Sequence, residues 1–251
     1  MVADRPPRRG HDVVLVTCEH GGNRIPPDLA PHFRGWTRTL ATHRGFDAGA
    51  LAMARDLARA FRAPLVASTV SRLVVDLNRS LHNPRVWSPV TAALPRPARA
   101  RIVARYYAPH WRRVEAVAQA AVASGRRVVH VASHSFTPVL DGVVRTADVG
   151  LLYEPARAAE ARLAAGWRHA LQRTAPALRV RRNYPYAGKG DGLTRALRRR
   201  FPEAQYVGIE LEVNQALCAG DARAWRRCRR AIVAALHEAL APVRRATEEG
   251  R

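Results

Sequence analysis

The sequence contains almost no lysine: Lys189 is the only one among 42 basic residues, and all the others are arginines. The formal net charge is nonetheless +22, which could attract nucleic acid. So strong a preference for arginine, together with abundant alanine, is typical of a GC-rich coding bias. The arginines are also spread along predicted helices without interleaved aromatic residues. We therefore expect mostly solvated helix faces, and a nucleic-acid-binding protein without catalysis is only an alternative.

Cysteine is also scarce, and long apolar runs are missing. Cys18, Cys218 and Cys228 are too few and too scattered for a disulfide framework or a cysteine zinc site. No run of about 18 apolar residues occurs, which excludes an ordinary transmembrane helix. The first residues, MVADRPPRRGHD, lack the apolar stretch of a secretory signal. These absences favour a reduced, cytoplasmic protein without a membrane partner.

Apolar residues make up 47% of the 251 positions, which is enough for a large core. Segments typical of strands alternate with segments typical of helices along the chain. We predict strands at 12–18, 64–69, 72–77, 127–133, 148–153, 178–182 and 205–213, and helices at 47–62, 97–124, 156–173, 190–200 and 219–244. This alternation predicts an α/β fold with a mostly parallel central sheet flanked by helices on both faces.

The sequence shows no internal repeat and no low-complexity linker. We therefore expect a single catalytic domain over residues 1–251, with its core at about 12–240. Residues 80–97 form the one long irregular stretch. Loops of that length in compact domains are often functional, so we expect this stretch to lie at the site and not at a domain boundary.

Polar side chains follow several of the predicted strands, and ligands bind beyond the carboxyl ends of strands in open α/β sheets. Each polar group alone has an ordinary interpretation, such as a helix N-cap for an aspartate ahead of a helix. Together, two histidines and one or two carboxylates are what a catalytic zinc ion requires: three protein ligands and one open position. The residues concerned are Glu19, His20, His43, Asp47, Asp76, Asn78, Arg79, His134, Glu210 and Glu212.

Seven motifs occur in a fixed order over nearly the whole chain. They are EHGGNRIP, FDAGA, SRLVVDLNRS, HSFTPVLDG, DVGLLYEP, NYPYAGKGDGLT and GIELEVNQ. In these motifs and their order the chain resembles the N-formylglutamate amidohydrolases. The resemblance implies a zinc-exopeptidase-like α/β fold and zinc-dependent hydrolysis of the amide bond of a small, anionic N-acyl amino acid. The known substrate of that family is N-formylglutamate, which is cleaved to formate and glutamate in histidine catabolism.

The resemblance also implies a set of zinc ligands. In related zinc carboxypeptidases and aspartoacylases the first two ligands form a His-x-x-Glu motif, but Asn23 stands three residues after His20 here. Cell-wall amidases with an HGG motif instead take a glutamate that opens the next long helix, a place occupied here by Asp47. The third ligand in both families is a histidine after a later strand, which matches His134. We therefore expect one Zn²⁺ per chain on His20, Asp47 and His134.

Glu19 and His43 are the alternatives for this ligand set. Carboxylates often orient metal-bound histidines from the second coordination shell, and that is the other role open to Glu19.

The resemblance assigns the remaining roles to residues near the last and the third predicted strands. Glu212 is the better match to the general base of the carboxypeptidase relatives, and Glu210 is its alternative. Asn78 and Arg79 resemble the pair that holds the substrate carboxylate. Further candidates for a second carboxylate are Arg72 and Arg145.

Two other enzyme classes remain open from the sequence. One is a zinc amidase that acts on peptide or cell-wall-type substrates, which the missing export signal disfavours. The other uses Cys18 as a nucleophile, but this cysteine lies within a predicted buried strand.

Overall fold

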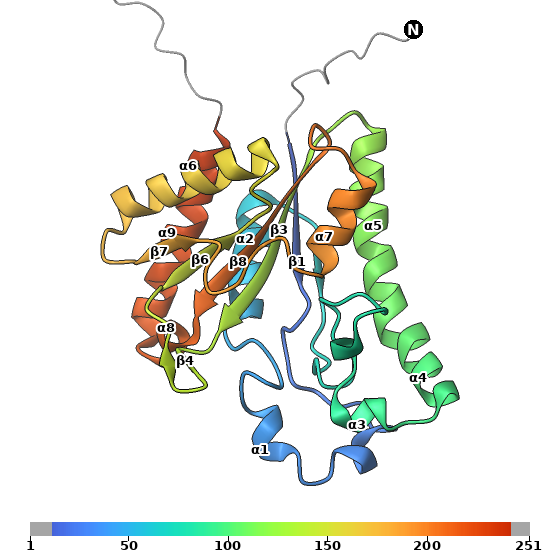
Figure 1. Ribbon diagram of the computed structural model, residues 1–251. Coiled ribbons are helices and arrows are strands. Elements are labelled where there is room, and N and C mark those ends of the chain that lie inside the picture. The colour runs from blue at the N-terminus through green and yellow to red at the C-terminus, as the bar shows by residue number, and fades with distance from the viewer. Residues whose placement is uncertain (1–11, 242–251) are drawn as a thin grey trace, which may run out of the picture.

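The computed structural model describes residues 12–241, which contain a six-stranded sheet in the order β2-β1-β3-β8-β6-β7 (Figure 1). The strands β2, β1, β3 and β8 run parallel, β6 is antiparallel to β8, and β7 is parallel to β6. Their bounds are β1 (Val13–Cys18), β2 (Leu65–Ala67), β3 (Val128–Phe136), β6 (Val149–Leu152), β7 (Val180–Arg182) and β8 (Tyr206–Asn214). The predicted α/β fold with a mostly parallel sheet is therefore confirmed.

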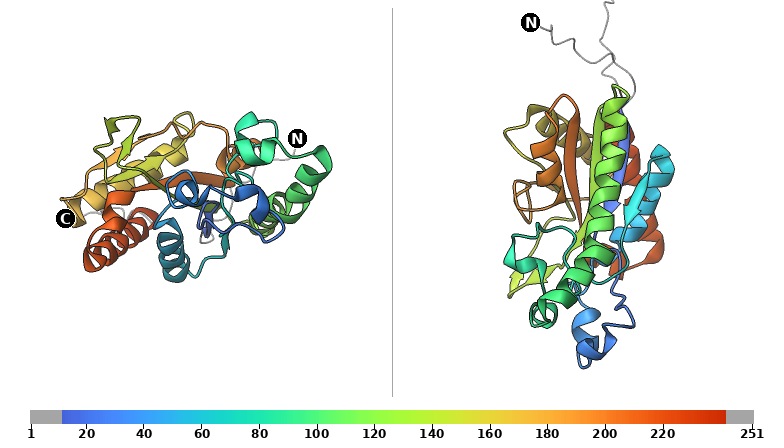
Figure 2. Two further views of the ribbon diagram at one scale, coloured as in Figure 1. Left: turned by 90° about the horizontal axis from the view of Figure 1, so that it is seen from below. Right: turned by 90° about the vertical axis from the view of Figure 1, so that its right-hand side faces the viewer.

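Helices cover both faces of the sheet (Figures 1 and 2). The helices α2 (Ala50–Phe61), α6 (Ala158–Thr174) and α9 (Ala222–Leu240) share the largest apolar cluster with one face. The helices α5 (Ala108–Ala123) and α7 (Leu193–Arg200) pack on the other face. The remaining elements are η1 (Ala30–Phe33), α1 (Thr37–Leu40), η2 (Pro84–Val86), α3 (Pro89–Ala92), α4 (Arg96–Ile102), η3 (Val103–Tyr107), α8 (Gln215–Ala219) and the hairpin β4 (Val139–Leu140) and β5 (Val143–Val144).

The alternation of side chains along each strand decides which residues reach the α5/α7 face. In β8, Ile209 and Leu211 belong to the α2/α6/α9 cluster, so Glu210 and Glu212 point to the opposite face. In β3, Val131 faces the same cluster, which directs His134 to the α5/α7 face. The polar residues thus gather on one face of the sheet, at its carboxyl edge.

The strand predicted at 72–77 is wrong. Residues 72–74 form turns, and the segment is tied to its surroundings by the bonds Val74 N to Ser71 O (2.9 Å) and Asp76 N to Val86 O (2.8 Å). Its apolar side chains, among them Val74 and Leu77, are buried in a second cluster. A short apolar run can be buried without a partner strand, so its sequence resembled that of a core strand.

The other predicted elements occur with shifted ends. The predicted helix 97–124 is formed by α4, η3 and α5 in succession, and residues 80–97 include the short helices η2 and α3. The strand β3 continues to Phe136, three residues beyond its predicted end, which places His134 inside the strand. Positions 242–244 of the last predicted helix lie outside the described residues. Within residues 12–241, no helix is both long and apolar enough to cross a membrane.

Candidate metal centre

The motif EHGG forms the turn that leaves β1, and its glycines allow a close backbone approach. A Cβ atom on Gly22 would lie 2.7 Å from the carbonyl oxygen of Thr69, and one on Gly21 would lie 2.9 Å from that of Ser68. The turn is held there because the Arg24 N–H donates to the Thr69 carbonyl at 3.0 Å. The two glycines are therefore needed for the tight turn that carries His20 at the end of the strand.

Asp47 precedes α2 but does not cap it. The N-cap residue is Gly49, at φ +80°, and among the described residues no side chain caps this helix by accepting from its first N–H groups. The Asp47 N–H instead donates to the carbonyl of His20 at 2.9 Å, which ties the two segments together. The carboxylate of Asp47 is thereby free to face the two histidines.

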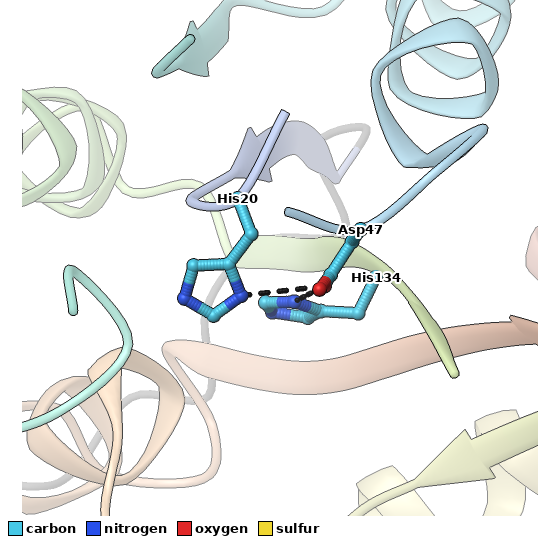
Figure 3. A group of neighbouring side chains, drawn as sticks. All are labelled: His20, Asp47 and His134. Carbon is cyan, nitrogen blue, oxygen red and sulfur yellow. Dashed lines mark hydrogen bonds and ion pairs between the residues drawn. The ribbon is translucent and has the colours of Figure 1, made fainter. Parts of the chain in front are cut away.

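The side chains of His20, Asp47 and His134 converge, as Figure 3 shows. The Oδ2 atom of Asp47 lies 2.9 Å from Nδ1 of His134 and 3.3 Å from Nδ1 of His20. One potential ligand atom from each of the three residues lies within 4.8 Å of the others. All three residues are at most 5% exposed. The sequence named the same three residues, and their role as ligands stays a prediction.

The second nitrogen of each histidine faces a further carboxylate. Nε2 of His20 lies 2.7 Å from Oδ1 of Asp76, and Nε2 of His134 lies 3.1 Å from Oε2 of Glu19. A cation on the two Nδ1 atoms would leave the ring protons on Nε2, where these carboxylates accept them. Two imidazoles and one carboxylate, each imidazole backed by another carboxylate, therefore form a donor set that suits zinc.

The carboxylates around the histidines are held in their ionised form. Burial opposes ionisation, but Arg72 and His20 hold the pKa of Asp76 well below its usual range. In the same way, His20 and His134 lower the pKa of Asp47 against the effect of burial. His110 and His134 lower that of Glu19. The centre is therefore negatively charged when its histidines are neutral, which favours a divalent cation.

A cavity of about 430 Å³ opens beside the three residues, with Glu210 and Glu212 in its wall. Glu212 pairs with His134 in the register of β3 and β8, so the two side chains are neighbours on one face. Burial raises the pKa of Glu212 to about 8. Its Oε2 atom has no hydrogen-bond partner among the described residues, whereas Glu210 accepts a hydrogen bond from the Thr194 hydroxyl.

The candidate substrate-binding residues have different surroundings. Asn78 and Arg79 line the cavity, and Arg79 donates to the carbonyl of Asp191 at 2.8 Å. The segment 80–97 helps to fix this wall, because the Ser80 N–H and the side chain of Asn83 donate to the Asp191 carboxylate.

The other two arginines already have protein partners. Arg72 binds the carboxylate of Asp76 at 2.6 Å and that of Asp47 at 3.4 Å. The guanidinium of Arg145 lies over the ring of Tyr186, which lines the cavity, and donates to its hydroxyl at 2.9 Å.

The alternatives from the sequence lie around the centre. Glu19 bridges from His134 toward α5, and His43 lines the cavity. Burial, followed by the charge of Arg145, lowers the pKa of His43. The side chain of Asn23 is bound to the Leu40 carbonyl.

Cys18 lies in the apolar core, and burial raises the pKa of its thiol, which disfavours a thiolate nucleophile.

Sequence reasoning assigned no role to two residues beside the centre. Asp76 lay in a stretch that was recognised as polar, but the incorrect strand assignment hid its position next to His20. His110 lies in a helix, 3.6 Å through Nε2 from Oε1 of Glu19. A single histidine in a helical segment carries no signal that would reveal such a contact.

The fold and the site together define an α/β protein with a candidate metal centre at the carboxyl edge of its sheet. A family model described as N-formylglutamate amidohydrolase matches residues 13–219. The chain therefore belongs to the N-formylglutamate amidohydrolase family, which confirms the family inferred from the motifs, and this membership supports an amidohydrolase.

Two solved structures are similar over nearly their full lengths. A gene product of Agrobacterium tumefaciens is 31% identical in sequence and superimposes with a TM-score of 0.78. The match covers 91% of this chain and 90% of that protein. An N-formylglutamate amidohydrolase from Ralstonia eutropha is 20% identical and superimposes with a TM-score of 0.65. The match covers 92% of this chain and 94% of that protein. At that identity the second similarity supports the fold alone. A comparison with curated proteins gave no match.

Proposed function

We propose that this protein is a cytoplasmic, zinc-dependent amidohydrolase that cleaves the amide bond of an N-acylated acidic amino acid such as N-formylglutamate. One observation carries the proposal: a buried cluster of two histidines and an aspartate borders a cavity, and a carboxylate orients each histidine from behind. The family of the chain supports the reaction type.

The proposed ligands are Nδ1 of His20, Nδ1 of His134 and the carboxylate of Asp47, with one Zn²⁺ per chain. A zinc ion held by these three residues would supply a bound water molecule with a pKa of about 7 and would polarise the amide carbonyl. Asp76 and Glu19 hold the imidazole rings in the orientation that presents Nδ1 to the cation.

Glu212 is the proposed general base. It accepts a proton from the attacking water and returns it to the leaving nitrogen. Its buried carboxylate beside His134 has an unpartnered oxygen that can take up this proton. The protein alone raises its pKa to about 8, and the charge of a nearby cation would lower it. Glu210 is the weaker candidate, because Thr194 already donates to its carboxylate.

Asn78 and Arg79 are proposed to bind one carboxylate of the substrate, since both line the cavity and carry hydrogen-bond donors. Arg145 is the candidate for a second carboxylate, together with the hydroxyl of Tyr186. Arg72 lines the cavity and is a further candidate for a substrate carboxylate, and its ion pairs hold in place the two carboxylates that flank His20.

The direct test is an assay of zinc-loaded protein with a panel of N-acyl amino acids. We expect hydrolysis of N-formyl and N-acetyl derivatives of glutamate or aspartate, and poor turnover when the α-carboxylate is an amide. Equal turnover of the free acids and of their amides would refute the carboxylate-binding role.

The metal centre is tested with variants of its proposed ligands. His20→Ala, His134→Ala and Asp47→Asn should lose bound zinc and activity while the fold remains, because each removes one of three ligands. The matched control is His43→Ala, which changes a histidine of the cavity wall outside the cluster and should keep its zinc. Stoichiometric zinc in Asp47→Asn would remove Asp47 from the ligand set.

A further inference from the structure

Glu19 is a buried carboxylate with an unusual set of neighbours. It is 0% exposed, and among the described residues neither of its oxygens accepts a well-directed hydrogen bond. The only charge partners that the structure shows within ion-pair distance, among residues 12–241, are His134 and His110. A buried carboxylate without donors costs several kcal/mol, and these two imidazoles are the groups placed to donate to it.

Each oxygen of Glu19 faces a different histidine. Oε2 lies 3.1 Å from Nε2 of His134, and Oε1 lies 3.6 Å from Nε2 of His110. Nε2 of His110 is itself buried and has no hydrogen-bond partner among the described residues. The three side chains come from β3, from the turn after β1 and from the first turn of α5.

The first turn of α5 is fixed against the loop beside the metal centre. The indole N–H of Trp111 donates to the Leu77 carbonyl at 2.9 Å, and the Tyr107 hydroxyl donates to the Arg79 carbonyl at 2.8 Å. These bonds flank His110 on both sides in the sequence. The imidazole of His110 is therefore presented to Glu19 by a helix whose position is set by the same loop that carries Asp76.

The arrangement on the other side of the centre has the same form. Asp76 uses Oδ1 for His20 and Oδ2 for the guanidinium of Arg72, at 2.7 and 2.6 Å. Each carboxylate thus contacts a candidate ligand through one oxygen and an anchoring cation or imidazole through the other. His110 holds the place for Glu19 that Arg72 holds for Asp76.

We propose that His110 is a positioning residue of the metal centre: its Nε2–H anchors Glu19, and Glu19 in turn orients His134 so that Nδ1 binds the cation. This inference rests on the metal site proposed above. A partner in the second coordination shell changes metal affinity by about 10- to 100-fold, which sets the expected effect.

The test measures the zinc dissociation constant by competition with a chromophoric chelator, and the melting temperature of the zinc-free protein. His110→Phe should weaken zinc binding about 10- to 100-fold. His110→Gln keeps an N–H donor and should recover most of the affinity. His130→Phe is the matched control: it removes another buried imidazole of the same sheet face, bound to Thr17 and Tyr206, and should lower the melting temperature without weakening zinc binding.

A double-mutant cycle shows whether His110 acts through Glu19. In a Glu19→Gln background, the change His110→Phe should have little further effect on zinc affinity, because the two residues act as one unit. Additive losses would overturn the inference, as would wild-type affinity in His110→Phe or equal losses in the Phe and Gln variants. If His110→Phe does not fold, the contrast between His110→Gln and His110→Asn decides, because the shorter amide cannot reach Glu19. Failure of the wild-type protein itself to bind zinc would refute the metal site and is a separate outcome.

Discussion

Buried His130 makes the stability of this protein depend on pH. Its ring lies between the Thr17 hydroxyl, 2.8 Å from Nε2, and the Tyr206 hydroxyl, 2.7 Å from Nδ1. Burial lowers its pKa from 6.5 to about 4. The folded state therefore resists protonation of a group that the unfolded chain protonates readily.

The sign and the size of the effect follow from these two values. Above pH 6.5 the histidine is neutral in both states and contributes no pH dependence. As the pH falls below 6.5, the unfolded state gains a proton that the folded state does not bind, so stability decreases until the pH passes the folded pKa near 4. The loss amounts to about 2 kcal/mol at pH 5 and about 3 kcal/mol at pH 4.

Urea unfolding of the metal-free protein at several pH values between 7.5 and 4 measures this loss. The comparison is with His130→Gln, which supplies a donor and an acceptor but does not titrate. The variant should be less stable at pH 7.5, and the difference in unfolding free energy between the two proteins should shrink by about 3 kcal/mol as the pH falls to 4, since other titrations cancel. A difference that does not change with pH would show that His130 titrates normally in the folded state.

Four further predictions concern the site. Asp76→Ala should weaken zinc binding about 10- to 100-fold, because His20 loses its outer partner; unchanged affinity in a chelator competition would contradict this. Arg79→Ala should lower kcat/KM for acidic substrates by a factor equivalent to about 2–5 kcal/mol and leave the zinc content unchanged, and steady-state kinetics with metal analysis checks both. Glu212→Gln should keep zinc and substrate binding while kcat falls by about 10² or more, with a milder effect of Glu210→Gln; the reverse order would exchange their roles. Lys189, the only lysine, lies in a turn whose end residues 187 and 190 line the cavity. A bound substrate or product should therefore slow the modification of Lys189 by an amine-reactive reagent. Mass spectrometry measures this labelling, and unchanged labelling would contradict the prediction.

Local sequence patterns were enough to predict the α/β class and the places where polar side chains gather. Strand and helix periodicities are local properties, and β1 (Val13–Cys18) and α2 (Ala50–Phe61) both occur close to their predicted bounds. The carboxyl ends of parallel strands meet at one edge of a sheet. For that reason alone, His20 and His134 could be expected near each other before the structure was known.

The groups that lie behind those residues became known only from the packing of the folded chain. Nothing in the local sequence distinguishes a buried apolar strand from a buried apolar loop, so the segment 72–77 was misassigned and the place of Asp76 beside His20 was hidden. The guanidinium of Arg72 lines the cavity, but only the fold shows that two carboxylates also lie against it. His110 reaches Glu19 from a helix 91 positions further along the chain, a contact that depends on how α5 packs on the sheet. Buried charged residues that are far apart in the sequence come into contact only through packing. That packing is established only when the whole chain has folded.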